Sequence, residues 1–445
     1  MKKQLYILLF GLSLAFPAMA QQKDTTASFS LQDAINYSLT HQISIKNAKI
    51  DEQIAINTVK QTIGIGLPQL SGNANFQDYL KVPTSLLPGE FFGAPGTQIP
   101  VKFGVKYNSG IGLELNQLLF DGSYLVGLKA SKTYKELSVK NTGRTRIETI
   151  VAVTKAYYSV LVSNEQLALI DANLERLKKS LNDTEQMLKN GFVEKIDVDR
   201  LSVLNNNLLT ERENVIRLLA LNVNLLKFQM GMSIGSALTL TDKINDVNID
   251  KTPIIGENQV YTKRIEYSLL QTQKKLNELD VKRYKSLFLP SLSAFGSTSA
   301  NFQSDKFSDL YDKRFPTTVI GLRLSVPIIS GGQKLYQLRN AKLEVLKTDN
   351  NLVNLQNSID LEVAQAQTTY LNGQKSLENQ KRNMELAKEV LRVTKIKYDQ
   401  GVGSSLEVTT AETSLKEAQN NYINALYDML INKVNLDKAL GNINY

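Results

Sequence analysis

The sequence carries the same series of short motifs twice, about 210 residues apart. A Leu-Pro-x-Leu motif, a Gly-Leu-x-Leu motif, an acidic residue followed by valine, and a closing glycine recur in the same order. The copies are residues 67–70 and 289–292, 112–115 and 321–324, Asp197-Val198 and Glu407-Val408, and Gly231 and Gly441. Repetition over this length predicts one structural unit that is present twice and packs about a pseudo-axis. The predicted repeats are residues 21–231 and 258–445, joined by a polar linker at 232–257.

The N-terminus has the features of a cleaved secretory signal. Lys2 and Lys3 supply the positive charge, residues 5–16 are mainly apolar, and Ala18-Met19-Ala20 provides a small-residue cleavage site. An uncleaved membrane anchor is the alternative, but about a dozen apolar residues fall short of the roughly 20 that a helix needs to cross a bilayer. We therefore predict that residues 1–20 are a signal peptide and that the mature chain is exported.

The composition argues against several classes of function. The chain has no Cys and one His, His41, so we expect no disulfides, no metal or redox centre and no cofactor. Its net charge of +9 is spread over the chain without a basic stripe, which argues against nucleic-acid binding. Residues 231–235 fit the Gly-x-Ser-x-Gly pattern of serine hydrolases, but a predicted helix precedes them and His41 lies about 190 residues upstream. We predict that the chain is not an enzyme, and since no phosphate-binding loop is present, a partner must supply energy.

The placement of proline favours long helices. All ten prolines lie in the signal, at Pro253, or within residues 68–100 and 290–327. Because proline is strongly disfavoured inside helices, the proline-free stretches indicate helix. Two of these helices would be about 100 Å long at 1.5 Å per residue, and each is followed by a glycine-containing tip and a shorter return helix. The predicted ranges are 122–190, tip 190–195 and 196–230, then 332–400, tip 400–405 and 406–440. Shorter helices are predicted at 31–62 and 258–288.

The apolar residues of the long helices recur at alternating steps of three and four. This spacing is that of a coiled-coil seam, and it predicts that each outgoing helix packs along its return helix. The seam positions are Leu167, Ile170, Leu174, Leu177, Leu181, Thr184 and Leu188 in the first repeat, and Leu377, Gln380, Met384, Ala387, Leu391, Thr394 and Tyr398 in the second; Thr184, Gln380 and Thr394 are their polar members.

Four segments of about ten residues alternate between apolar and polar side chains, as strands with one apolar and one polar face do. They are residues 70–80, 105–116, 291–302 and 317–326; the third is less regular because Phe295 falls among small polar residues. A soluble two-sided sheet would show the same alternation, so the pattern alone does not decide between a soluble sheet and a membrane wall. Residues 81–104 and 303–316 are the expected outer loops.

The strand count constrains how the chain assembles if these strands lie in a membrane. Four strands cannot close a barrel, and lipid tolerates no open sheet edge, so several chains must pool their strands. An eight-stranded barrel is filled by its own side chains, whereas a larger one holds water. Because the polar faces carry residues such as Asn73, Asn75, Lys106 and Glu114, we predict three or more chains.

The chain resembles the TolC-type outer-membrane efflux proteins over essentially the whole mature sequence. The resemblance rests on the Leu-Pro-x-Leu motifs, on Val-Pro-Ile-Ile-Ser-Gly-Gly at 326–332, and on the tip sequences 191–198 and 401–408. It implies a mixed, mainly α fold in a homotrimer. Four strands per chain contribute to a twelve-stranded transmembrane β-barrel, and long coiled-coil α-helical hairpins form an α-barrel in the periplasm. Residues 116–120 depart from the family by lacking its usual proline.

The resemblance implies an exit duct in outer-membrane lipid that serves a tripartite efflux pump or a type I secretion system. Its partners would be a periplasmic adaptor protein and an inner-membrane transporter. The alternative is a soluble periplasmic coiled-coil scaffold or adaptor with a small β-domain. We expect the tips to dock the adaptor, because they are the only breaks in the long helices and expose apolar groups there. The tip residues are Gly191, Phe192, Val193, Gly401, Val402 and Gly403.

A gate is expected just beyond the tips, where acidic residues follow each turn. Three-fold symmetry makes a ring of each inward-facing acid, and converging like charges form a cation-binding constriction. In the resemblance, Glu407 falls on one of the family's aperture aspartates and Thr410 replaces the other. Asp197 and Tyr398 fall on positions that hold the tips closed, and we expect a hydrogen bond between them. A solvated helix face is the alternative for these acids, as it is for their neighbours Asp199 and Glu412.

Overall fold

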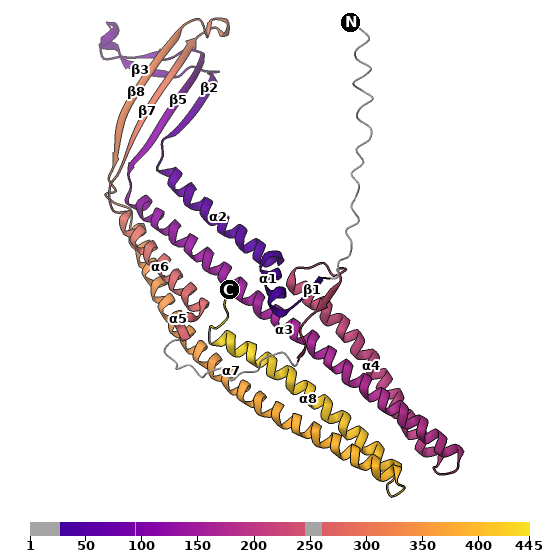
Figure 1. The fold of residues 1–445 in the computed structure, drawn as a ribbon. Helices are drawn as coiled ribbons and strands as arrows, with labels where there is room; N and C mark the ends of the chain where they lie inside the picture. Colours follow the sequence, from indigo (N-terminus) through magenta and orange to yellow (C-terminus); the bar gives the residue numbers. More distant parts are fainter. Residues whose placement is uncertain (1–26, 94, 245–259) are drawn as a thin grey trace, which may run out of the picture. The chain divides into compact units, whose positions relative to one another are not determined.

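The computed structural model describes residues 27–93, 95–244 and 260–445 (Figure 1). The predicted signal and residues 245–257 of the predicted linker lie outside these ranges. Long helices dominate the described part of the chain. In that part, no helix is both long enough and apolar enough to cross a membrane.

The chain divides into two compact units. Unit 1 comprises the described residues within 1–43, 149–252 and 368–435, and unit 2 those within 44–148, 253–367 and 436–445. Each unit therefore combines segments of both sequence repeats, and boundaries between the units fall within the helices at residues 148/149, 367/368 and 435/436 and at the helix start at 43/44.

Two helical hairpins supply the long helices. The first consists of α3 (Gly122–Lys189) and α4 (Lys195–Met230), and the second of α7 (Gln333–Asp399) and α8 (Ser405–Ala439). The predicted ranges agree with these to within a residue at each end, because proline-free sequence and a glycine turn mark both limits.

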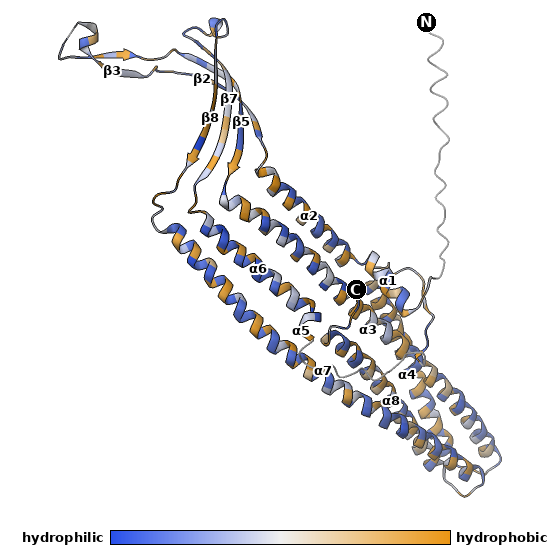
Figure 2. Cartoon of the chain, turned by 60° about the vertical axis from the view of Figure 1, so that its left-hand side comes forward, coloured by the Kyte–Doolittle hydropathy of each residue, from blue (hydrophilic) through white to orange (hydrophobic). Residues whose placement is uncertain are grey.

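The predicted seam is confirmed in unit 1. Within the first hairpin, Ile170 and Leu177 of α3 are buried against Leu201, Leu208 and Val215 of α4, with Leu167, Leu174, Leu181 and Leu204 packed around them. Within the second, Leu391 is buried with Val408, Ala411 and Leu415, and Met384, Ala387 and Tyr398 pack against that cluster. Figure 2 shows apolar and polar residues alternating along these helices, as two-sided packing requires.

The helices predicted at 31–62 and 258–288 are each interrupted in the structure. The first is α1 (Leu31–His41) followed by α2 (Ile43–Ile65), and the second is α5 (Val260–Lys263) followed by α6 (Ile265–Ser286). The residues between them, Gln42 and Arg264, have extended backbone. Neither residue type breaks helices, so the cause is tertiary.

A closing glycine packs against each of these interruptions. A Cβ atom on Gly231 would lie 2.7 Å from Cα of Gln42, and one on Gly441 would lie 3.0 Å from the carbonyl carbon of Lys263. Only glycine permits such an approach, and both glycines also have positive φ. The two glycines occupy corresponding positions in the predicted repeats, so the same backbone contact occurs twice.

The four predicted strands form one antiparallel sheet in unit 2. The strands are β2 (Gln69–Asp78), β5 (Tyr107–Phe120), β7 (Ser291–Ser304) and β8 (Arg314–Ser325), in the order β2-β5-β7-β8. Strands of both repeats therefore lie in one sheet, with β5 paired to β7. A second, two-stranded sheet of parallel β1 (Ala27–Phe29) and β6 (Leu238–Leu240) lies in unit 1.

The register gives the large sheet one apolar and one polar face. Two neighbouring sets of cross-strand partners show this. One set contains Leu70, Leu115, Gly296 and Ile320, and the set beside it, on the other face, contains Ser71, Glu114 and Ser297. Cross-strand partners lie on the same face, so the alternation in each strand adds up across the sheet. The apolar face is uncovered in the single chain, and Ile320 is 87% exposed.

The predicted outer loop at 81–104 is more ordered than expected. It contains an antiparallel hairpin of β3 (Thr84–Pro88) and β4 (Gln98–Lys102), with a 3₁₀ turn at Gly89–Phe92 between them. Figure 2 shows this hairpin extending from the end of the four-stranded sheet within unit 2. Alternation over only five residues in each strand is too short a signal to separate from loop.

Candidate functional site

The two hairpin tips of unit 1 form the candidate site. Each tip turns through a glycine with positive φ, Gly191 at 78° and Gly401 at 73°. The amides of Phe192 and Val402 donate to Met187 O (2.9 Å) and Lys397 O (3.1 Å), which satisfies carbonyls at the ends of α3 and α7. The turns leave Phe192 77% and Val402 72% exposed. Val193 and Gly403, the other predicted tip residues, are half-buried.

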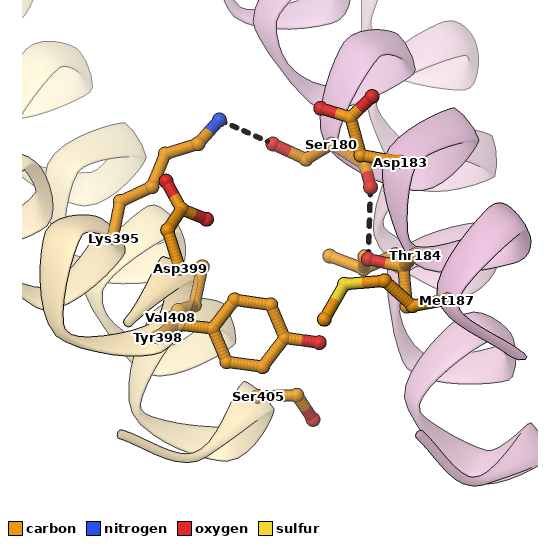
Figure 3. Close-up of a pocket in the computed structure, with 10 residues that line it drawn as sticks. Ser180, Asp183, Thr184, Met187, Lys395, Tyr398, Asp399, Ser405 and Val408 are labelled. Carbon is orange, nitrogen blue, oxygen red and sulfur yellow. Dashed lines mark hydrogen bonds between the residues drawn. The ribbon is translucent and has the colours of Figure 1, made fainter. Parts of the chain in front are cut away.

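A recess, which we call the tip pocket, lies behind these turns. It is lined from both hairpins. Figure 3 shows the Tyr398 ring pointing into it, with Lys395 reaching across to Ser180 of α3. The Lys395 Nζ–Ser180 Oγ distance is 2.9 Å. The lining residues are Ser180, Asp183, Thr184, Met187, Leu201, Lys395, Tyr398, Asp399, Ser405 and Val408.

Asp197 joins the two hairpins, but not through the predicted partner. Its carboxylate accepts hydrogen bonds from the hydroxyl of Ser405, at the start of α8, and from the amide of Glu194 at 3.2 Å. Arg200 adds an ion pair at 3.4 Å. With these partners, the expected hydrogen bond from Tyr398 to Asp197 is not formed within the chain, and that prediction is wrong for the single protomer.

The hydroxyl of Tyr398 has no hydrogen-bond partner among the described residues, although it is buried. Burial raises the pKa of Tyr398, the neighbouring Thr184 side chain lowers it in part, and the negative charges of Asp197 and Asp399 raise it further, so that the net shift of the pKa is upward. The phenol is therefore neutral at physiological pH and keeps its proton. An unpaired buried hydroxyl is unfavourable, since it has lost its water without gaining a partner.

Replacing Tyr398 by Phe is expected to leave the stability of the protein unchanged or to raise it by about 1 kcal/mol, because the substitution removes an unsatisfied polar atom and keeps the ring. Thermal unfolding of the detergent-solubilised protein measures this. Tyr157, which is buried and whose hydroxyl donates to Asp242 Oδ2 at 2.8 Å, provides the control, and Tyr157→Phe should not stabilise. A clear loss of stability in Tyr398→Phe would show that the hydroxyl is paired in the assembled protein.

The predicted gate residues on α8 are solvent-accessible. The Glu407 carboxylate is about half exposed, and its nearest cation is Lys397 Nζ at 3.7 Å. The amide of Glu407 donates to Ser404 Oγ at 3.2 Å, which caps the first turn of α8. Thr410 is exposed and its hydroxyl donates to Leu406 O at 2.8 Å. Exposed ion pairs such as Lys397–Glu407 hold a side chain only weakly, so the Glu407 side chain is free to change its orientation.

Glu412 differs from the other acids near the tips. Its side chain is 5% exposed, and Arg176 of α3 grips it with two hydrogen bonds, Nε–Oε1 at 3.1 Å and Nη2–Oε2 at 2.8 Å. Arg176 also donates to Asn173 Oδ1 at 2.9 Å, and Asn173 donates to Gln419 Oε1 at 2.6 Å. Glu412 therefore ties the first hairpin to α8 and does not contribute to a solvated acidic face.

Further polar pairs connect the hairpins of unit 1. Lys416 of α8 lies 2.6 Å from Glu211 of α4, and Asn420 donates to the same carboxylate at 3.3 Å. Sequence reasoning missed these contacts and the Arg176–Glu412 pair, which join residues more than 200 positions apart. Asp197 and Ser405, and likewise Glu211 and Asn420, are separated in sequence by nearly the repeat distance. Pairing residues at that distance was therefore the one sequence signal that could have identified such contacts.

Within the described ranges, no group of three or more His, Asp or Glu side chains is placed to hold a metal ion. His41, the only histidine of the chain, stacks on Tyr37 at a centroid distance of 3.8 Å and bonds to Thr40. It is the last residue of α1 and lies outside the tip pocket.

Comparison with known proteins decides the family. The model of the family described as Outer membrane efflux protein matches residues 34–207 and 261–442. The chain belongs to this family. Its location is the outer membrane, and the predicted resemblance, localisation and role in efflux are confirmed. The first matched segment covers α3 and the first part of α4, and the second covers both helices of the second hairpin.

Individual relatives are distant but cover most of the chain. The outer membrane protein TolC of Salmonella enteritidis is 24% identical over 351 residues, which span 77% of this chain and 71% of that protein. The proteases secretion protein PrtF of Dickeya chrysanthemi is 21% identical over 341 residues, or 75% and 72% of the two chains. The open-state crystal structure of the Neisseria gonorrhoeae MtrE outer membrane channel superposes with a TM-score of 0.75 at 20% identity, covering 92% of this chain and 88% of that one. This chain therefore shares the fold of an outer-membrane channel.

Proposed function

We propose that three copies of the chain assemble into one passive exit duct across the outer membrane. The exposed apolar face of the four-stranded sheet carries this proposal. In that sheet β2 and β8 are edge strands, and lipid tolerates neither an open edge nor an unpaired backbone group. Pooling the strands of three chains closes the sheet with its polar face around a water-filled passage, whereas two chains would give a barrel filled by side chains.

The helical hairpins continue the passage as a second barrel, and their tips dock a periplasmic adaptor that connects to an inner-membrane transporter. Two observations support tip docking: the exposure of Phe192 and Val402, and the rigid glycine turns that present them. Efflux and secretion relatives both occur in the family, and the chain uses no chemistry of its own in this role. A soluble periplasmic scaffold would have no use for the apolar sheet face.

The constricted end of the duct, where it opens and closes, lies at the tips. Each protomer contributes Glu407 to a ring of carboxylates, with Thr410 one turn further along α8. The Asp197–Ser405 hydrogen bond and the Arg176–Glu412 pair hold each protomer's hairpins together, so the first hairpin and α8 move as one body when the duct opens.

Planar-bilayer recordings test this function. The purified protein should form discrete cation-permeable channels that di- or trivalent cations block, because a carboxylate ring binds them. Glu407→Ala should weaken that block about tenfold, and Glu389→Ala, which removes an acid paired with Arg392 on α7, should leave it unchanged. Absence of channels would contradict the exit-duct function, whereas unchanged block in Glu407→Ala would contradict only the gate.

A further inference from the structure

One aromatic residue interrupts the polar face of the sheet at its helix-side end. Phe295 of β7 lies on that face, directly opposite Gly321 of β8. Its ring occupies the space above Gly321, since a Cβ atom there would lie 2.7 Å from Phe295 Cζ. The glycine in the Gly-Leu-x-Leu motif of the second repeat therefore provides a seat for the ring.

Arg323 lies on this ring. It is two residues beyond Gly321 on β8, hence on the same polar face, and its guanidinium carbon is 5.2 Å from the Phe295 ring centroid. That distance is within the range of a cation–π contact. No carboxylate pairs with Arg323 among the described residues, and its side chain is exposed. Its positive charge is therefore held in place by an apolar surface and is not neutralised.

The surrounding wall makes this charge conspicuous. The polar face of the four strands consists mainly of amides, hydroxyls and glycine, with Leu118, Val319 and Phe315 as further apolar residues, and its other charged residue is Glu114. Glu114 accepts a hydrogen bond from Asn116 Nδ2 at 3.0 Å. On β7, the cross-strand partner of Glu114 is Ser297 and that of Arg323 is Ser293. These two serines are about 14 Å apart along the strand. At that separation, across water, the two charges interact weakly.

We propose that Arg323, seated on Phe295, is an anion-binding site on the wall of the duct that selects organic anions with an aromatic or apolar part. The guanidinium binds a carboxylate, sulfonate or phosphate through two parallel hydrogen bonds, and the ring beside it offers apolar contact to the rest of the ligand. The proposal rests on the proposed function, in which the polar face lines the passage and every protomer repeats the site.

The test uses pyranine, a pyrene trisulfonate dye, added to the β-strand side of channels in planar bilayers. We expect wild-type channels to show concentration-dependent block. Arg323→Gln should weaken the block about tenfold, the size of losing one charge-assisted contact. Gly321→Ala should weaken it less, because it displaces the Phe295 ring and leaves the charge. Arg314→Gln is the matched control, since it removes the same charge from the opposite, apolar face of the same strand and should change nothing.

The outcomes separate the two levels of the account. Unchanged pyranine block in Arg323→Gln, or an equal loss in Arg314→Gln, would overturn the site and leave the duct intact. Equal block of wild-type channels by inorganic sulfate would overturn the selectivity for aromatic anions. Failure of the wild-type protein to form channels would instead contradict the exit-duct function itself. Arg323→Lys keeps the positive charge but not the planar pair of donors, so it should give intermediate block. Such a result would also show that the loss of block in Arg323→Gln is not caused by a failure to fold.

Discussion

Arg176→Ala is expected to destabilise the hairpin end of unit 1 by about 3 kcal/mol. Glu412, its partner, is 5% exposed, so the substitution would leave a carboxylate buried without a counter-charge. Removing one member of a buried ion pair costs about 3–5 kcal/mol, and the lower end applies because Arg176 is itself 31% exposed. Asn173 would also lose the contact that orients it towards Gln419. Hydrogen exchange of the α3 and α8 segments around these residues measures the loss directly.

Two variants act as controls for this experiment. Arg212→Ala breaks the pair with Asp171, whose members are 35% and 47% exposed, and should have a much smaller effect because both charges face solvent. Glu412→Gln keeps a hydrogen-bonding group of the same shape and should cost less than Arg176→Ala. Exchange that rises equally in Arg176→Ala and Arg212→Ala would show that the Arg176–Glu412 pair does not hold the hairpins together.

Phe192→Asp and Val402→Asp are each expected to abolish most export while the protein stays assembled in the outer membrane. Both side chains are exposed at turns whose backbone is fixed by helix-end hydrogen bonds, so the substitutions do not disturb the fold. In a docked complex these apolar groups would be buried, and an unpaired charge there costs several kcal/mol, which lowers adaptor affinity by about a hundredfold or more. Retention of a fluorescent efflux dye, in cells whose efflux depends on this chain, measures export.

The matched control is Phe91→Asp, which places the same charge on a similarly exposed phenylalanine of the β3–β4 hairpin. Export should survive this change because Phe91 lies in unit 2 and outside the tips. If both tip variants export normally, the adaptor does not dock through the tips.

Most of the fold could be predicted from sequence because its signals are local and long. Proline-free stretches and glycine turns set the ends of α3, α4, α7 and α8, and the three-four spacing identified the buried seam around Leu177 and Leu391. Alternation over ten or more residues located the strands of the large sheet. The break at Arg264 was missed because the glycine that packs beside it, Gly441, lies far along the chain, and such a close backbone approach leaves no local trace in the sequence.

The site was predicted less well because it depends on which helix faces carry each polar group. Asp197 was correctly placed beside the tip, but its partner is Ser405 and not Tyr398, since the Tyr398 ring packs with the α7–α8 seam. From the sequence, Glu412 is indistinguishable from the other acids of a solvated helix face. The structure shows that it pairs with Arg176, which lies 236 positions away in the chain. Phe295 appeared in the sequence only as an irregularity in an alternating strand. Its position over Gly321 and under Arg323 is visible only in the structure, and it indicates that the ring holds the arginine side chain.

The central claim is that three chains pool their strands into one duct. Native mass spectrometry of the mature protein, extracted from outer membranes in mild detergent, tests it most directly. The account predicts a dominant species of three times the chain mass. A barrel made from three chains covers the edges of β2 and β8 and also leaves a water-filled passage, whereas the barrel that two chains can form is filled by side chains. A monomer or a dimer as the stable species would contradict it.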